Sequence, residues 1–84
     1  MAPETASKWY GVYKEAYAVT PSDAATFKTT RALYVGGQGG DVNVQMANGN
    51  TVLFGAVAMG SILPVGVTMV YSTSTNATEI VRLY

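Results

Sequence analysis

The residues that could do chemistry in this 84-residue chain are few and scattered. The chain has no His and no Cys, which removes the usual general bases, thiol nucleophiles and most metal ligands. No Ser or Thr lies in a GxSxG elbow. The spacing of the acidic residues implies no shared site; they are Glu4, Glu15, Asp23, Asp41 and Glu79. We therefore expect no enzyme, no catalytic residue, no cofactor and no metal site.

The glycine-rich run 36–40, GGQGG, invites comparison with a phosphate-binding loop. Such a loop leads into a helix and carries a Lys followed by Ser or Thr, whereas here Asp41 and an alternating strand follow. Asp41 also lacks the companion acids of a calcium site. We interpret the run as a mobile hairpin connection whose glycines supply positive φ angles, with Gln38 at a tip that could touch a neighbouring subunit.

Aromatic side chains gather near the start of the chain, where Trp9, Tyr10, Tyr13 and Tyr17 follow one another closely. Trp and Tyr are enriched at protein contacts, and a domain this small cannot enclose four large rings. We predict that these residues, together with Tyr84 at the end of the last strand, are interface residues. The alternatives are rings that cover one end of the core and, less favoured, rings that stack on carbohydrate.

Alternation of apolar and polar residues, broken by Gly, Pro and Asn, predicts about seven short strands. Leu33 and Val35 fall on one side of their strand, with Ala32 and Tyr34 on the other. The expected strands cover residues 17–20, 31–35, 41–46, 51–54, 61–63, 65–71 and 79–84. We expect an all-β fold, a small antiparallel β-sandwich or barrel at 16–84, preceded by an extended, partner-contacting arm at 1–15.

The Asn48-Gly49 pair predicts a β-hairpin but leaves its register open. A two-residue loop would pair Met46 with Thr51. A three-residue loop of residues 48–50 would place Val52 beside Met46 and Phe54 beside Val44. We prefer the second register because it collects the bulky residues on one face. Residues 55–60, GAVAMG, are expected to form a link of small residues.

The charge pattern points to association with other chains. Basic and acidic residues cancel, and no basic stripe for nucleic acid is present. No charged residue lies between Val42 and Thr78, and a small domain without Cys or His has oligomerisation as its remaining means of added stability. The apolar run 52–71 is long enough for a membrane helix, but its glycines, Pro64 and β-branched residues disfavour one. We expect no signal peptide either.

Six segments occur in an order that carries a family resemblance. They are AYAVTPSD (16–23), TRALYVGG (30–37), GDVNV (40–44), NTVLF (50–54), ILPVGVTMV (62–70) and TNATEIVRLY (75–84). On this ordered set the chain resembles the head spike base proteins, short virion proteins of tailed phages and gene transfer agents. The segments lie within about four-fifths of the chain. Residues 1–15 match least, and the GGQGG run is longer than the usual loop.

The resemblance implies a small β-barrel or sandwich that assembles as a homo-oligomeric ring, a pentamer or a trimer, on the capsid surface of a virion. There, at a capsid vertex, it would contact the major capsid protein or a neighbouring virion protein and hold an external fibre or spike. We expect edge strands and the aromatic arm to make these contacts. The alternatives are a carbohydrate-binding adhesin-type module and a single-span membrane peptide. The resemblance supplies no catalytic residues.

Overall fold

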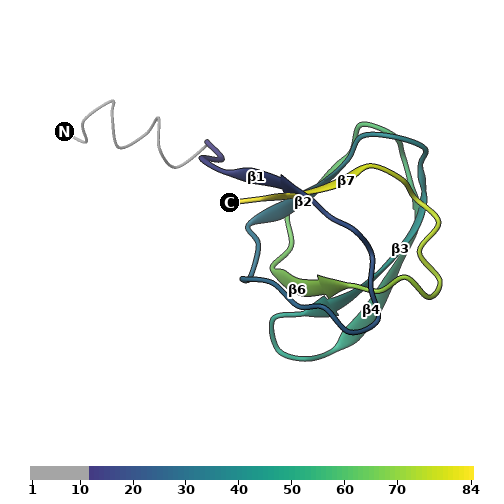
Figure 1. The fold of residues 1–84 in the computed structure, drawn as a ribbon. Coiled ribbons are helices and arrows are strands. Elements are labelled where there is room, and N and C mark those ends of the chain that lie inside the picture. Colours follow the sequence, from purple (N-terminus) through teal and green to yellow (C-terminus); the bar gives the residue numbers. More distant parts are fainter. Residues whose placement is uncertain (1–11) are drawn as a thin grey trace.

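A computed structural model describes residues 12–84, which form seven strands and no helix (Figure 1). The strands are β1 (Ala16–Ala18), β2 (Ala32–Val35), β3 (Gly40–Met46), β4 (Thr51–Val57), β5 (Ile62–Leu63), β6 (Val67–Val70) and β7 (Ile80–Leu83). Each of the seven expected strands is present, and the all-β fold class is confirmed. Between β1 and β2, residues 23 and 24 form a bend.

The strands form two antiparallel sheets. Sheet A has four strands in the order β1-β7-β2-β5, and sheet B has three in the order β4-β3-β6. The strand nearest the end of the chain, β7, is therefore internal to sheet A, between β1 and β2. The chain passes repeatedly between the two layers, which lie over each other in Figure 1 as a small sandwich.

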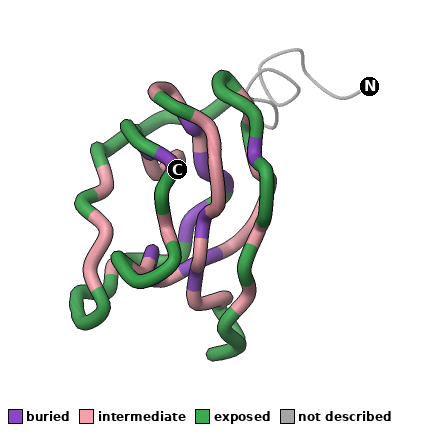
Figure 2. The backbone as a smooth tube through the Cα atoms, turned by 90° about the vertical axis from the view of Figure 1, so that its right-hand side faces the viewer, coloured by how far each residue is buried: buried purple, intermediate pink, exposed green. Residues whose placement is uncertain are grey.

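The core lies between the two sheets and consists mainly of β-branched side chains, which suit a pleated surface. The fully buried large side chains come from four strands and are Leu33, Val35, Val42, Val44, Val67, Val70 and Ile80. Figure 2 shows the buried positions as short purple segments along a backbone that is otherwise half-buried or exposed. Each such side chain contributes about 1.5–3 kcal/mol relative to an exposed one, so a few small residues supply most of the apolar stabilisation.

The β3–β4 hairpin places its bulky residues on one face, as expected, but the preferred register is wrong by two residues. Val44 pairs with Val52 and Val42 with Phe54. The loop is residues 47–49, because Gly49 has φ +92° and closes a turn by donating its N–H to the Met46 carbonyl. A three-residue hairpin loop needs its glycine in the last position, and this requirement sets the register. Residues 55–57, expected in a link, extend β4.

The GGQGG connection is not a hairpin, because β2 belongs to sheet A and β3 to sheet B. Gly37 donates to the Thr78 carbonyl at 3.1 Å, and Thr78 donates back to the Gln38 carbonyl at 2.9 Å. A Cβ on Gly39 would meet the Val57 carbonyl oxygen at 2.5 Å. Within the run only Gly40 has a positive φ. The glycines therefore serve mainly to allow close packing, and the interpretation of the run as a hairpin connection is wrong, whereas the contact of Gln38 with a neighbouring subunit stays a prediction.

The free side of β6 is covered by residues 22–30. The N–H groups of Ser22, Phe27 and Thr30 donate to carbonyl oxygens of β6 at 2.8–3.0 Å. The Thr30 hydroxyl donates to the Val65 carbonyl at 2.8 Å and accepts from the Val67 N–H at 3.1 Å. Thr30 is 4% exposed, so these two bonds satisfy main-chain groups that water reaches poorly.

The polar segment 72–79 is held against the body of the domain by side-chain hydrogen bonds. Asp23 accepts from the N–H of Thr73 at 3.0 Å and from its hydroxyl at 2.6 Å. These bonds favour the charged carboxylate and lower the pKa of Asp23. The Asp41 N–H donates to the Asn76 side chain at 2.6 Å. The segment is thus an ordered cover for one end of the sandwich.

The apolar run 52–71 consists of β4, β5, β6 and their connections. Within residues 12–84 there is no helix long and apolar enough to cross a membrane.

Candidate interaction surfaces

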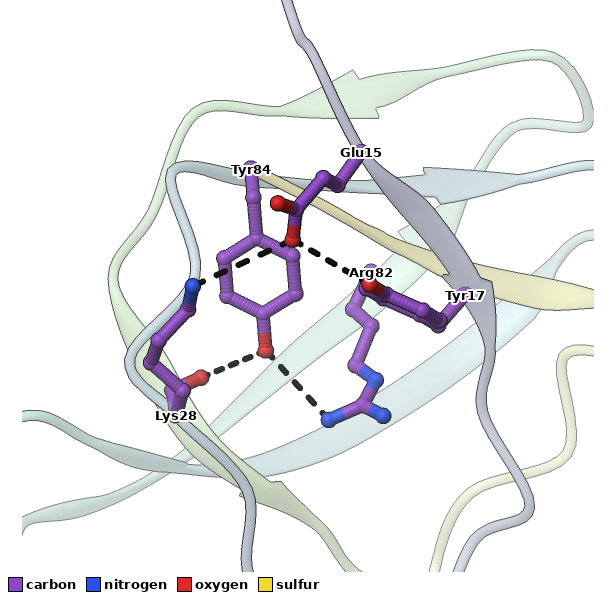
Figure 3. A network of polar contacts seen from close by, with 5 residues as sticks. All are labelled: Glu15, Tyr17, Lys28, Arg82 and Tyr84. Carbon is purple, nitrogen blue, oxygen red and sulfur yellow. Dashed lines mark hydrogen bonds and ion pairs between the residues drawn. The ribbon is translucent and has the colours of Figure 1, made fainter.

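An arginine in β7 lies at the centre of an aromatic cluster at one end of the sandwich (Figure 3). The Arg82 guanidinium is 4.9 Å from the ring centroids of both Tyr17 and Phe27, and 5.8 Å from that of Tyr84. It also donates to the Tyr84 hydroxyl at 3.3 Å, and that hydroxyl donates to the Lys28 carbonyl at 2.6 Å. Such cation–π contacts tie β1, β7 and the 22–30 segment together.

Tyr17 and Glu15 extend this cluster to the surface. The Tyr17 hydroxyl donates to Glu15 at 3.2 Å, and this hydrogen bond to a carboxylate raises the pKa of Tyr17. The phenol therefore remains a donor throughout the neutral range. Lys28 lies 4.0 Å from the same carboxylate, but both side chains are mostly exposed, so this ion pair contributes little.

A second pairing of arginine and tyrosine precedes β1. The Arg31 guanidinium donates to the Val12 carbonyl at 2.8 Å and lies 5.3 Å from the Tyr13 ring centroid. Tyr13 is 37% exposed. Trp9 and Tyr10, the other two predicted interface residues of the arm, lie outside the described residues.

The described interface candidates differ in what they can offer a partner. Tyr13 and Tyr17 are exposed, although an arginine lies over each ring. The side chain of Gln38 is exposed, and its main-chain carbonyl accepts a hydrogen bond from the Thr78 N–H. Tyr84 is 9% exposed and packs within its own subunit. The structure brings Tyr17 and Tyr84 together, with ring centroids 5.9 Å apart, and places Gln38 elsewhere. Their interface role stays a prediction.

The outer face of sheet A is apolar, a feature that we did not anticipate. Cross-strand register assigns alternate rows to opposite faces, and the rows that contain Leu33, Val35 and Ile80 point into the core. The other rows therefore point away from the core; they are Ala16–Leu83–Ala32 and Ala18–Val81–Tyr34–Ile62. In these rows Ala32 is fully buried, and Ala16, Ala18 and Ile62 are exposed. None of these side chains is charged, and only Tyr34 carries a polar group. An antiparallel sheet that faced water here would carry polar residues at these positions.

The sequence contained a signal for this face. The segments AYA, ALYV and IVRL have apolar residues at both alternating sets of positions, apart from Arg82, whose row points inward. Strands that read as continuous apolar runs are buried on both faces. The alternation in this segment predicts a partner, the core, only for Leu33 and Val35, and it predicts none for Ala32 and Tyr34 on the other side of the strand.

A shallow groove lies at the opposite sheet, beside the β3–β4 turn. It has a volume of about 490 Å³ and is lined by Met46, Ala47, Asn48, Asn50, Val52 and Gly66. Among residues 12–84 there is no group of three or more His, Cys, Asp or Glu side chains that could hold a metal ion. The features that stand out on the surface of residues 12–84 are thus an apolar sheet face and a shallow groove, and exposed apolar patches are typical of protein interaction sites.

A chain in a structure described as "Capsid of native GTA particle computed with C5 symmetry" is similar to this protein in both fold and sequence. The TM-score is 0.78 and the identity 33%, over 89% of this chain and 87% of that chain. No family model and no curated protein matches the sequence. The class defined here is that of virion proteins from phage-like particles. This chain belongs to the family of that GTA capsid-particle chain.

Proposed function

We propose that the protein is a homo-oligomeric vertex adaptor, a head spike base or capsid-decorating protein that joins a phage-like capsid to an external fibre. The observation that carries this proposal is the similarity to a chain of a capsid computed with C5 symmetry. A five-membered ring is the closed assembly that matches a five-fold capsid vertex. A trimer on a local three-fold axis is the corresponding alternative.

The surface of sheet A supports the same function. Its outward rows include Ile62, which is 50% exposed, and the smaller exposed residues Ala16 and Ala18. An apolar sheet face of this kind suits a permanent contact with the major capsid protein or a neighbouring virion protein. The side chains of residues 1–15 would add contacts from the arm, where Trp9, Tyr10 and Tyr13 lie.

The carbohydrate-binding alternative is less well supported. Sugars stack on open faces of aromatic rings, whereas the guanidinium groups of Arg82 and Arg31 already occupy one face of Tyr17 and of Tyr13. Substitution Trp9→Ala separates the two functions. A lectin would lose sugar binding and keep its oligomer, whereas the adaptor would lose capsid binding and show no sugar affinity to begin with.

The proposal is tested with the full chain and purified capsids that lack it. Light scattering after size exclusion should give a mass several times 8.8 kDa, and an image of the decorated particle should show density at the vertices. A folded monomer that does not bind capsids would contradict the vertex-adaptor function. Density confined to the portal or tail would agree with a virion adaptor but would contradict its position at the capsid vertex.

A further inference from the structure

The four sheet edges of the sandwich differ in how well they are protected. The β6 edge is covered by hydrogen bonds from residues 22–30, as described above. The β5 edge is two residues long and is followed by Pro64, which has no N–H to donate. No described segment pairs with the outer side of β1 or of β4. Proteins normally protect such edges because unpaired main-chain groups attract other strands.

The open groups of β4 can be assigned from the hairpin. The Met46 N–H donates to the Asn50 carbonyl at 2.7 Å, so Met46 and Asn50 form a hydrogen-bonded pair. Hydrogen-bonded and open pairs alternate along an antiparallel ladder. The main-chain groups of Val52 and Phe54 therefore point to β3, and those of Thr51 and Leu53 point away from it. Leu53 is 52% exposed.

The same reasoning applies to β1. The Tyr84 N–H donates to the Glu15 carbonyl at 2.9 Å, and the Val19 N–H donates to the Ile80 carbonyl at 2.8 Å. Because hydrogen-bonded and open pairs alternate, the main-chain groups of Tyr17 point toward β7. The N–H and carbonyl groups of Ala16 and Ala18 point away from β7. All three residues of β1 are exposed.

These two open edges lie on opposite flanks of the sandwich and in different sheets. β1 runs on to Ser22, whose N–H binds the Val70 carbonyl, so β1 lies on the β6 side. β4 runs on to Gly60, whose N–H binds the Val35 carbonyl at the start of the turn into β5, so β4 lies on the β5 side. Two different contact sites on opposite flanks are what a head-to-tail ring requires.

We propose that the outer edge of β4 in one subunit pairs with the outer edge of β1 in the next, so that sheet B of each subunit continues into sheet A of its neighbour. This inference rests on the homo-oligomeric ring of the proposed function and specifies its contact. The partner is a second copy of this chain. Each copy carries one β1 edge and one β4 edge, so the two kinds of edge are present in equal number. Charge also permits the pairing, because β4 carries no charged residue to oppose Lys14 or Glu15 beside β1.

The test uses proline, which removes an N–H and is tolerated where that N–H points away from the sheet. Leu53→Pro should leave the β3 pairing intact and block the β4 edge. Ala18→Pro should leave the β7 pairing intact and block the β1 edge. Each variant should fall from the oligomeric mass to about 8.8 kDa by light scattering, with its β circular dichroism retained. The matched control Leu53→Ala keeps the N–H and should keep the oligomer.

Mixing the two proline variants gives the decisive result. Leu53→Pro retains a working β1 edge and Ala18→Pro a working β4 edge, so an equimolar mixture should form a dimer of twice the chain mass and nothing larger. Sedimentation at high protein concentration measures this mass. If Ala18→Pro dimerises alone, β4 pairs with itself and the head-to-tail contact is wrong. If both variants stay fully oligomeric, the edges are not the contact, although the ring and the proposed function stand. A monomeric unmodified chain would remove both proposals.

Discussion

The substitution Thr30→Val tests whether one buried hydroxyl holds the cover of β6 in place. Valine has nearly the shape of threonine, so the exchange removes the hydroxyl without opening a large cavity. The Val65 carbonyl and the Val67 N–H then lose the partner that lies 2.8 Å and 3.1 Å away, respectively. The main-chain bond from the Thr30 N–H to the Val67 carbonyl remains.

The expected cost follows from the surroundings of the two orphaned groups. Val67 is fully buried, so its unsatisfied N–H costs about 1–3 kcal/mol, whereas Val65 is partly exposed and water can reach its carbonyl at a cost of about 0.5–1 kcal/mol. The added methyl group returns about 0.8 kcal/mol. We expect a net loss of about 2 kcal/mol, which lowers the melting temperature by about 8–16 °C in a domain of this size.

Urea and thermal unfolding at one fixed protein concentration measure this loss, since association would otherwise change the apparent stability. Thr30→Ser is the matched control, because it keeps the hydroxyl and removes only the methyl group at a cost of about 0.8 kcal/mol. Thr30→Val should therefore be the less stable variant. If it equals the unmodified protein, or if Thr30→Ser is the worse of the two, the hydroxyl is not what stabilises this junction.

Three further predictions concern other parts of the domain. Arg82→Lys keeps the charge but loses the planar contact with several rings, and should cost about 1–2 kcal/mol in urea unfolding; an unchanged midpoint would show that charge alone suffices. Gly39→Ala should destabilise by about 1–3 kcal/mol in urea unfolding, because its Cβ would meet two backbone atoms at less than 3 Å; Gly55→Ala, whose Cβ would lie 3.6 Å from the Asp41 carboxylate, should cost less, and an equal loss in both variants would contradict the clash. Hydrogen bonds from Thr73 lower the pKa of Asp23, so its contribution is present at neutral pH and is lost as the pH falls below about 4. Asp23→Asn should show a smaller drop in urea midpoint between pH 7 and pH 2.5, and an equal drop would exclude this carboxylate as the cause.

Much of the local structure follows from the sequence. Alternation places Leu33 and Val35 in the core, and each expected strand is found close to its expected position. The pattern works because a strand that is buried on one face must repeat every two residues. The hairpin faces follow from the same rule. The register of the hairpin does not follow from this rule, because a shift by two residues leaves every side chain on the same face. The positive φ of Gly49 decides between the expected and the observed register.

The sequence does not predict which distant segments become neighbours in the fold, and the reason is a different one. The GGQGG run looks flexible because glycine permits many conformations, yet here a Cβ on Gly37, Gly39 or Gly40 would collide with Thr78, Val57 or Asn76, respectively. No local pattern shows which distant segment will approach. The covering role of residues 22–30 and the central place of Arg82 among three rings are hidden for the same reason, because both depend on which strands become neighbours.

The internal position of β7 has a consequence for how the protein is made. β1 has no strand to pair with, and β2 lacks one of its two neighbours, until the ribosome has synthesised residues 80–83. Folding dominated by such distant pairings is also slow. A chain cut short before residue 80 lacks the strand to which β1 binds, and therefore presents no ordered β1 edge. Under the proposed ring contact, incomplete chains are thereby kept out of growing particles.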